Sequence, residues 1–291
     1  MANLFAMVTL KKSTNYTINA LHSFFKYTKL EKEDDFFLID NDNLKDDQFS
    51  KFNQLTLINN EKPLSFAQNV NQAIDEAIKN KKNLIFLNND IIFTKNWFKA
   101  ISLISDSISL PSNNQIFQYE SELGILKLKV TMNLSDFNDN YDLLEEILEQ
   151  HRKKIKSGQT FQTLLMPFFA FKVPYKILKD IGHFDISFGA GGGEDVDYRI
   201  RCAIKGYEVN FLTDSYLLHF HGKSTWDIEN KEETAQKNVE YENVFRKKWG
   251  DELTKIFIER NNFLDILEKK NLMDLYKMNK FTELIKKLKI F

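Results

Sequence analysis

The sequence predicts an α/β protein with a mostly parallel central sheet and a C-terminal helical extension. Between residues 4 and 90, apolar runs of strand length alternate with amphipathic segments of helix length, and no hairpin turn joins two neighbouring runs. Strands that alternate with helices pair in parallel through right-handed crossovers. With 291 residues, 43% of them hydrophobic, the chain is expected to fold as an enzyme-sized globular unit with a buried core.

The first part of the chain supplies the predicted parallel strands. In order, the predicted elements are the strand Leu4–Leu10, the helix Ile18–Tyr27, the strand Phe36–Ile39, the strand Leu55–Ile58, the helix Phe66–Ile78 and the strand Leu84–Leu87. The second strand stops at Asp40 and the fourth is followed by Asn88, Asn89 and Asp90. Ligands of parallel sheets bind at the carboxyl ends of strands, so both acidic stops are candidates for a binding site.

The rest of the chain is predicted to form a pocket wall, further strands and the helical extension. Residues Ile101–Thr163 are less regular and carry a polar, acidic helix at Tyr141–His151, which indicates an insertion beside a pocket. The predicted strands that follow are Leu164–Phe171, Glu208–Leu212 and Tyr216–His221. In the last strand, period-two alternation places His219 and His221 on one face. From about Asp227 onward the pattern is helical and charged.

A glycine-rich acidic element is the most informative part of the sequence. Gly191-Gly192-Gly193 runs into Glu194, Asp195 and Asp197, which open a helical stretch. Glycines let a backbone approach a ligand closely, so we expect Asp195 or Glu194 to act as a general base toward an attacking hydroxyl. A structural interpretation stays open, because acids in a first turn complement the helix dipole and Asp195 and Asp197 each precede an arginine by four residues.

Asp90 is the candidate ligand of a divalent cation. A carboxylate just past a buried strand can hold Mg²⁺ or Mn²⁺ together with substrate phosphates, although Asn and Asp are also the commonest turn formers. His219 or His221 is expected to complete this metal site, since their spacing follows a strand end. Taken singly, each histidine is more often structural than a ligand.

Composition and failed motifs exclude other classes. The 40 basic and 41 acidic residues nearly cancel, so no global field favours nucleic acid. The single cysteine, Cys202, is expected to be buried packing. Residues 189–194 lack the last glycine of a dinucleotide fingerprint, so no NAD site is expected. With neither an export signal nor an apolar run of roughly 20 residues, the expected location is the cytoplasm.

Several motifs in one order resemble those of nucleotide-sugar glycosyltransferases of the A-type fold, specifically the family 2 inverting enzymes of bacterial polysaccharide type. The motifs are Phe37–Asp42, Pro63–Ile74, Leu87–Asp90 with Asn96–Phe98, Ile181–Asp185, Glu194–Asp197 with Arg201 and Gly206-Tyr207, and Leu218–Ser224. The resemblance covers most of residues 4–225. Two positions depart from the pattern, because Asn88 stands where many relatives carry an aspartate and Ser65 replaces a glycine.

The resemblance implies a Rossmann-like catalytic domain over residues 1–225, with a nucleotide-sugar-binding half at 1–100, an acceptor and catalytic half at 101–225, and a helical extension at 226–291. It implies that Asp195 is the base, that Glu194 orients the acceptor, and that Asp90 and His219 hold Mn²⁺ or Mg²⁺. The implied contacts to the donor are Thr9, Asp40, Asn71, Asn88, Asp90, Gly192 and Gly193.

The implied reaction moves a sugar from a nucleotide diphosphate donor, expected to be a UDP-sugar, to a hydroxyl of a glycan or lipid-linked acceptor with inversion. The Gly-Gly-Glu-Asp segment also resembles that of galactosyl- and N-acetylgalactosaminyl-transferring relatives. One rival is a sugar-phosphate nucleotidyltransferase, but Leu10–Thr14 lacks the glycine-rich phosphate loop that this class needs. A second rival is an inactive sugar-binding or scaffold domain, which Asn88 would fit.

The C-terminal tail has two interpretations. The apolar residues Met278, Phe281, Leu284, Ile285 and Leu288 recur at helical spacing, and lysines line the remaining surface. Such a helix can lie in an anionic membrane interface at the inner face of the cell membrane. Alternatively, it packs on the catalytic domain or on a second subunit of a homo-oligomer.

Overall fold

The computed structural model describes residues 1–44, 47–137, 140–154, 158–166, 169–189, 191–223 and 231–290. The strands are β1 (Asn3–Thr9), β2 (Asp35–Asp40), β3 (Leu55–Asn59), β4 (Asn83–Leu87), β5 (Ile91–Ile92), β6 (Ile108–Ser112), β7 (Thr160–Gln162), β8 (Ala170–Val173), β9 (Val209–Tyr216) and β10 (Leu218–His219). The helices are α1 (Thr14–Tyr27), α2 (Phe66–Lys79), α3 (Trp97–Leu103), α4 (Gln118–Glu122), α5 (Asp142–Arg152), α6 (Tyr175–Ile181), α7 (Glu194–Lys205), α8 (Lys231–Phe257), α9 (Phe263–Lys269), α10 (Met273–Lys277) and α11 (Phe281–Ile290). Ser224 of the predicted closing motif and the predicted boundary at 225/226 lie outside the described residues, and the division into domains stays a prediction.

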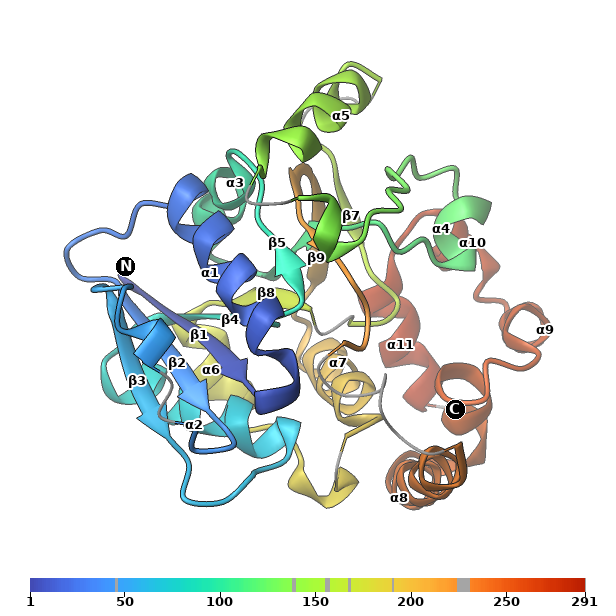
Figure 1. The fold of residues 1–291 in the computed structure, drawn as a ribbon. Coiled ribbons are helices and arrows are strands. Elements are labelled where there is room, and N and C mark those ends of the chain that lie inside the picture. The colour runs from blue at the N-terminus through green and yellow to red at the C-terminus, as the bar shows by residue number, and fades with distance from the viewer. Residues whose placement is uncertain are drawn as a thin grey trace.

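Within the described ranges, eight strands form one mixed sheet in the order β3-β2-β1-β4-β8-β6-β9-β7 (Figure 1). The first four pair in parallel, which confirms the predicted strands to within one or two residues. From β1 the chain moves outward to β3 and then returns to β4 on the other side of β1. Ligands of such sheets bind outside the carboxyl ends of the strands at this switch point.

The second half of the sheet departs from the parallel pattern. Strand β8 runs antiparallel to both β4 and β6. The predicted strand Leu164–Phe171 is wrong over Leu164–Met166, which is not in a strand, and positions 167–168 lie outside the described residues. The carbonyl of Thr163, just before this segment, accepts a hydrogen bond of 3.0 Å from Arg199 Nε, which ties the chain at this point to α7.

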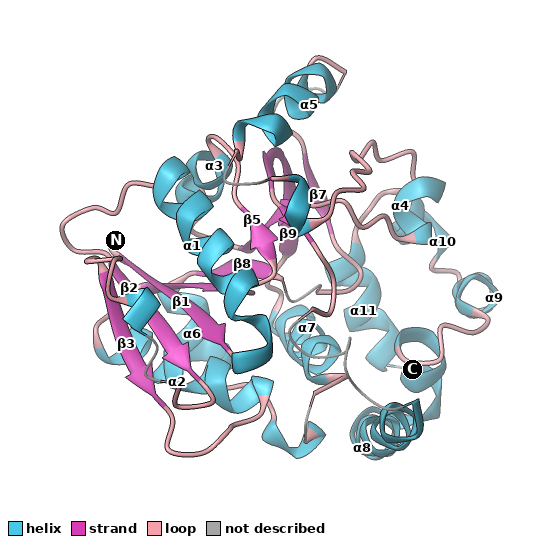
Figure 2. Ribbon diagram, viewed as in Figure 1, coloured by secondary structure: helices cyan, strands magenta, loops and turns pink. Residues whose placement is uncertain are grey.

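Helices cover both faces of the sheet (Figure 2). Helices α1 and α3 bury apolar residues against one face, and α2 and α6 against the other. Helix α2 begins at Ser65, whose side chain accepts from Gln68 N while Gln68 bonds back to the Ser65 amide. This capping box is worth about 1 kcal/mol and explains why serine serves at this position. Cys202 is fully buried, as predicted.

The C-terminal helices share a core with α7. Val196, Ile200 and Ala203 of α7 pack with residues of α8 and with Leu284 and Ile285 of α11. The apolar face of α11, except the preceding Met278, is thus buried in the protein, so the face that was predicted to enter a membrane interface is not available for it. In the described part of the chain, every helix is too short or too polar to span a bilayer.

Candidate active site

A short two-stranded ladder brings Asp90 beside His219. Strand β5 follows Asp90 directly, and it pairs antiparallel with β10 so that Ile91 lies opposite His219. The amide of Phe220 donates to the Asp90 carbonyl at 2.9 Å. As a result, His219 Nε2 lies 3.2 Å from Asp90 Oδ1, although 129 positions separate the two in the sequence.

The predicted strand Tyr216–His221 is wrong beyond His219. His221 has a positive φ of 57°, so the period-two pattern ends there and the chain turns away. Its ring still lies against that of His219, with 4.3 Å between the centroids. His219, which lies 3.2 Å from Asp90, is the better-placed partner of the two, and its role as a metal ligand stays a prediction.

The Asp90 and His219 side chains fit a hard divalent cation. Both are buried, and among the described residues Asp90 Oδ1 and the two ring nitrogens of His219 have no hydrogen-bond partner beyond the 3.2 Å contact that Oδ1 and Nε2 make with each other. Burial opposes ionisation of Asp90, but the nearby His219 and the amide of Lys223, 3.2 Å away, hold its pKa below the ordinary value. Buried polar atoms are normally satisfied, and carboxylate and imidazole are both ligands of Mn²⁺. Because the described residues contain no cluster of three or more such ligands, a bound cation would need further oxygen atoms from substrate or water.

The glycine tract before α7 accommodates an aromatic side chain. Gly192 and Gly193 have φ of 119° and 83°, which L side chains rarely adopt. A Cβ on Gly192 would lie 2.5 Å from Cδ1 of Tyr241 on α8. The close approach that the sequence predicted at these glycines is therefore made, within the protein itself, by the Tyr241 ring.

The first turn of α7 carries two carboxyl groups whose pKa values are raised. Burial, together with the charge of Glu194, raises the pKa of the partly exposed Asp195 to about 7. Burial likewise raises the pKa of Glu194, whose Oε2 accepts from the Gly192 amide. A carboxyl that titrates near neutral pH suits a general base.

Asp197 forms the i,i+4 ion pair with Arg201 that the structural interpretation of this helix predicts. Its carboxylate is fully buried and pairs with Arg201 Nε at 2.9 Å and with Lys248 Nζ of α8 at 2.7 Å. The corresponding pair of Asp195 with Arg199 does not form, because Arg199 turns to Thr163 and Thr282. Asp195 is therefore left facing the cavity.

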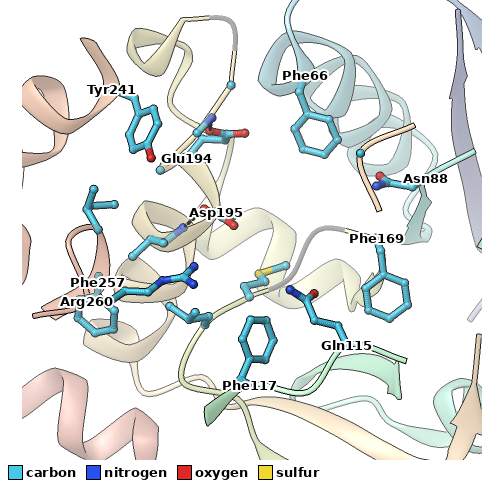
Figure 3. A pocket seen from close by; sticks show the side chains of 18 of the residues that line it. Phe66, Asn88, Gln115, Phe117, Phe169, Glu194, Asp195, Tyr241, Phe257 and Arg260 are labelled. Carbon is cyan, nitrogen blue, oxygen red and sulfur yellow. Dashed lines mark hydrogen bonds between the residues drawn. The ribbon is translucent and has the colours of Figure 1, made fainter. Parts of the chain in front are cut away.

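Two adjoining cavities lie between the sheet and α7. The first, about 340 Å³, is lined by Asn88, His219, Glu194, Asp195 and the glycine tract, with Tyr241 above it (Figure 3). The second, about 600 Å³, lies at the carboxyl ends of β1 and β4 and shares Phe66 and Asn88 with the first. The two cavities thus lie next to each other between the carboxyl ends of β1 and β4 and the carboxylates of Glu194 and Asp195.

By sequence, neither a protein-family model nor a curated protein matches this chain. Solved structures do resemble it. GalNAc-T7, with UDP, GalNAc and Mn²⁺, matches at a TM-score of 0.59 and 16% identity over 98% of this chain and 55% of its own, so the chain spans about half of that protein. S. aureus TarS 1-349 with UDP-GlcNAc matches at 0.54 and 12%, over 99% and 88%. A mannosyltransferase from Pyrobaculum calidifontis, PcManGT with GDP-Man and Mn²⁺, matches at 0.51 and 10%, over 99% and 86%.

The chain has the A-type glycosyltransferase fold.

Within this A-type fold, three of the predicted donor residues line the cavities. Asn88 lies at the junction of the two, and Gly192 and Gly193 line the smaller one. Asp40 is fully buried, whereas its neighbour Asn41 lines the larger cavity. Asn41 is held there by hydrogen bonds of 2.9 Å from Leu64 N and Asn60 Nδ2 to its Oδ1.

The side chains of Thr9 and Asn71 make hydrogen bonds within the protein. The hydroxyl of Thr9 is buried 2.9 Å from that of Thr17 on α1. The amide group of Asn71 exchanges hydrogen bonds with the backbone of Phe184, at 2.9 Å and 2.8 Å. Neither residue is among those that line the two cavities, so their predicted contact with a donor stays a prediction that this geometry does not favour.

Sequence reasoning did not single out several residues of the smaller cavity. Among them are Gln115, Phe117, Tyr241 and Arg260. Figure 3 shows the side chain of Arg260 directed toward the same cavity as Asp195. Arg260 has a positive φ of 56°, a conformation that a bulky residue seldom adopts. No local motif marks these positions, because tertiary packing alone brings them to the site.

Proposed function

We propose that this chain is a metal-dependent, inverting glycosyltransferase that moves a sugar from a nucleotide diphosphate donor, a UDP-sugar, to a hydroxyl of a glycan acceptor. One observation carries the proposal: the buried Asp90 and His219 side chains lie 3.2 Å apart with no other partner among the described residues for Asp90 Oδ1 and the His219 ring nitrogens, and His219 lines the same cavity as Asp195. The solved glycosyltransferases of the same fold, bound to nucleotides or nucleotide sugars, support the substrate class.

The donor would occupy both cavities. Its nucleoside would lie in the larger cavity beside Asn41, and Asn88, at the junction, would contact the ribose or the diphosphate. Asp90 and His219 would hold Mn²⁺ or Mg²⁺ against the diphosphate. When bound, such a cation stabilises the charge that develops on the leaving nucleotide.

Asp195 would carry out the proton transfer. Its carboxylate accepts the proton of an acceptor hydroxyl while that oxygen forms a bond to the anomeric carbon, and the bond from this carbon to the diphosphate oxygen breaks. Attack from the face opposite the leaving group inverts the anomeric configuration in one displacement. The pKa of about 7 keeps Asp195 basic enough to take the proton, and Glu194 beside it would orient the acceptor.

The test measures nucleotide release from a panel of UDP- and GDP-sugars with and without Mn²⁺. Asp90→Ala and His219→Ala are expected to abolish Mn²⁺-dependent release and to weaken Mn²⁺ binding in calorimetry. His221→Ala is the matched control, since its ring touches His219 while the ion pair with Asp90 is made by His219. Mn²⁺-dependent release that survives in Asp90→Ala would show that the reaction does not use this pair.

A further inference from the structure

A side cavity of about 430 Å³ adjoins the cavity that is lined by Asp195. Phe117, Leu165 and Arg260 line both cavities. Part of the remaining wall of the side cavity comes from α4 and from the segment 262–265 at the start of α9. The volume falls within the range of about 300 to 1,000 Å³ that is typical of small-molecule sites.

The lining combines aromatic rings and the aliphatic side chains of Leu164, Leu165, Ile256 and Leu264 with a polar rim. Phe117 and Phe263 offer ring surface, and Tyr119 stacks behind Phe117 at 5.7 Å between centroids with planes 9° apart. Tyr119 is itself fixed by a hydrogen bond of 2.9 Å to Thr163. The ring of Phe117 is therefore held in place without a ligand.

Polar groups surround these rings. The carboxylate of Glu122 is positioned by Gln118 Nε2, 2.9 Å away, and by the hydroxyl of Tyr276. Asn262, Asp265 and Arg260 complete the rim. An apolar chain in this cavity would cover several polar groups without pairing them, which is unfavourable. A sugar residue matches both parts of the lining, with its C–H face on a ring and its hydroxyls on amides and carboxylates.

We propose that the side cavity binds the second sugar residue of the acceptor, so that the enzyme extends an oligosaccharide rather than a single sugar. This inference rests on the proposed function. The terminal sugar would present its hydroxyl to Asp195. The next residue would pass Phe117 and Arg260, which belong to both cavities, and lie against Phe263. The acidic residues Glu122 and Asp265 on the rim favour a neutral glycan over an anionic one.

The experiment measures binding to the full chain, with UDP and Mn²⁺ present, by saturation-transfer NMR. The probes are neutral disaccharides, the methyl glycosides of their non-reducing sugars, and the octyl glycosides of the same sugars. A disaccharide is expected to bind about tenfold more tightly than its methyl glycoside, which is the effect of covering part of an aromatic side chain. Phe263→Ala and Asn262→Gly should remove this advantage and leave methyl glycoside binding unchanged. Glu268→Gln, an exposed acid on α9 outside the cavity, is the matched control and should keep it.

The inference is overturned if no disaccharide of the panel binds more tightly than its methyl glycoside, or if both cavity variants keep the tighter binding. It is also overturned if only the octyl glycosides bind more tightly than the methyl glycosides, which would assign the cavity to an apolar aglycone. Failure here is distinguishable from failure of the proposed function. Mn²⁺-dependent nucleotide release from the donor, with water as the acceptor, would use Asp90, His219 and Asp195 but not the side cavity, so it persists when the side cavity has another role.

Discussion

Replacing Asp195 by asparagine is expected to abolish transfer and to stabilise the protein. The cavity and Glu194 disfavour the ionised carboxyl, which is the reason for its raised pKa. Asparagine has nearly the same shape and can still accept the hydrogen bond from the Val196 amide, which is 2.7 Å long in the native protein. The substitution therefore removes an unfavourable charge and few favourable contacts.

The size of the effect follows from the pKa. A rise from 3.8 to about 7 corresponds to about 4 kcal/mol above pH 7 if this carboxyl titrated alone. Glu194 titrates with it and shares the repulsion, so we expect about 2 kcal/mol from Asp195→Asn, or about 4 to 8 °C in Tm. Because the folded-state pKa is raised, the destabilisation is absent below the unfolded value, grows as the pH rises from 4 to 7 and is constant above 7.

Thermal unfolding at pH 8 and at pH 5 tests this reasoning. The gain in Tm should be full at pH 8 and less than half as large at pH 5. Asp197→Asn, two residues later in the first turn of the same helix, is the matched control. It removes a buried charged partner of Arg201 and Lys248 and should lower the free energy of unfolding by about 3 kcal/mol. A Tm for Asp195→Asn that is equal to or lower than that of the wild type at pH 8 refutes the inference that ionisation of Asp195 destabilises the folded protein.

Three further outcomes are expected. Sugar transfer by the wild-type protein should show a kcat/KM that falls about tenfold per pH unit below pH 7 as Asp195 gains its proton, and a flat profile between pH 5.5 and 7 would exclude it as the base. Gly192→Ala should lose about 2 kcal/mol in urea unfolding, because its Cβ would collide with Tyr241 at a positive φ; an unaffected midpoint would contradict that packing. Leu284→Ala should cost about 3 kcal/mol, whereas Met278→Ala, 60% exposed, should change stability by less than about 0.5 kcal/mol, and equal losses would contradict the buried face of α11.

The half of the fold that contains β1 to β4 could be predicted because its signals are local. Strands β1, β2 and β4 are built on continuous apolar runs, β3 carries three apolar residues, and the helix after Ser65 begins with a capping box, so neighbouring residues specify each element. Asp90 and Asp195 could be singled out for the same reason, since each stands next to an element boundary.

The acceptor side could not be predicted because its geometry depends on distant contacts. The left-handed backbone at His221 broke the strand period that placed the two histidines. Tyr241 and Arg260 reach the cavity from α8 and the turn that follows it, and no spacing rule connects them to the glycine tract. Burial of the tail helix was likewise decided by α7, whose partner surface the tail's own pattern does not reveal.

The packing of α11 on α7 also determines when the site becomes complete during synthesis. Arg199 of α7 donates to Thr282 of α11, which lies 83 positions later. Because chains fold from the N-terminus as they emerge, the sheet from β1 to β4 can form its parallel pairs long before α11 exists. Helix α7 then has no cover for much of its apolar face. The ribosome therefore delivers the β1–β4 half of the sheet first, and α7, whose first turn carries Glu194 and Asp195, is covered by α11 only after α11 has been made.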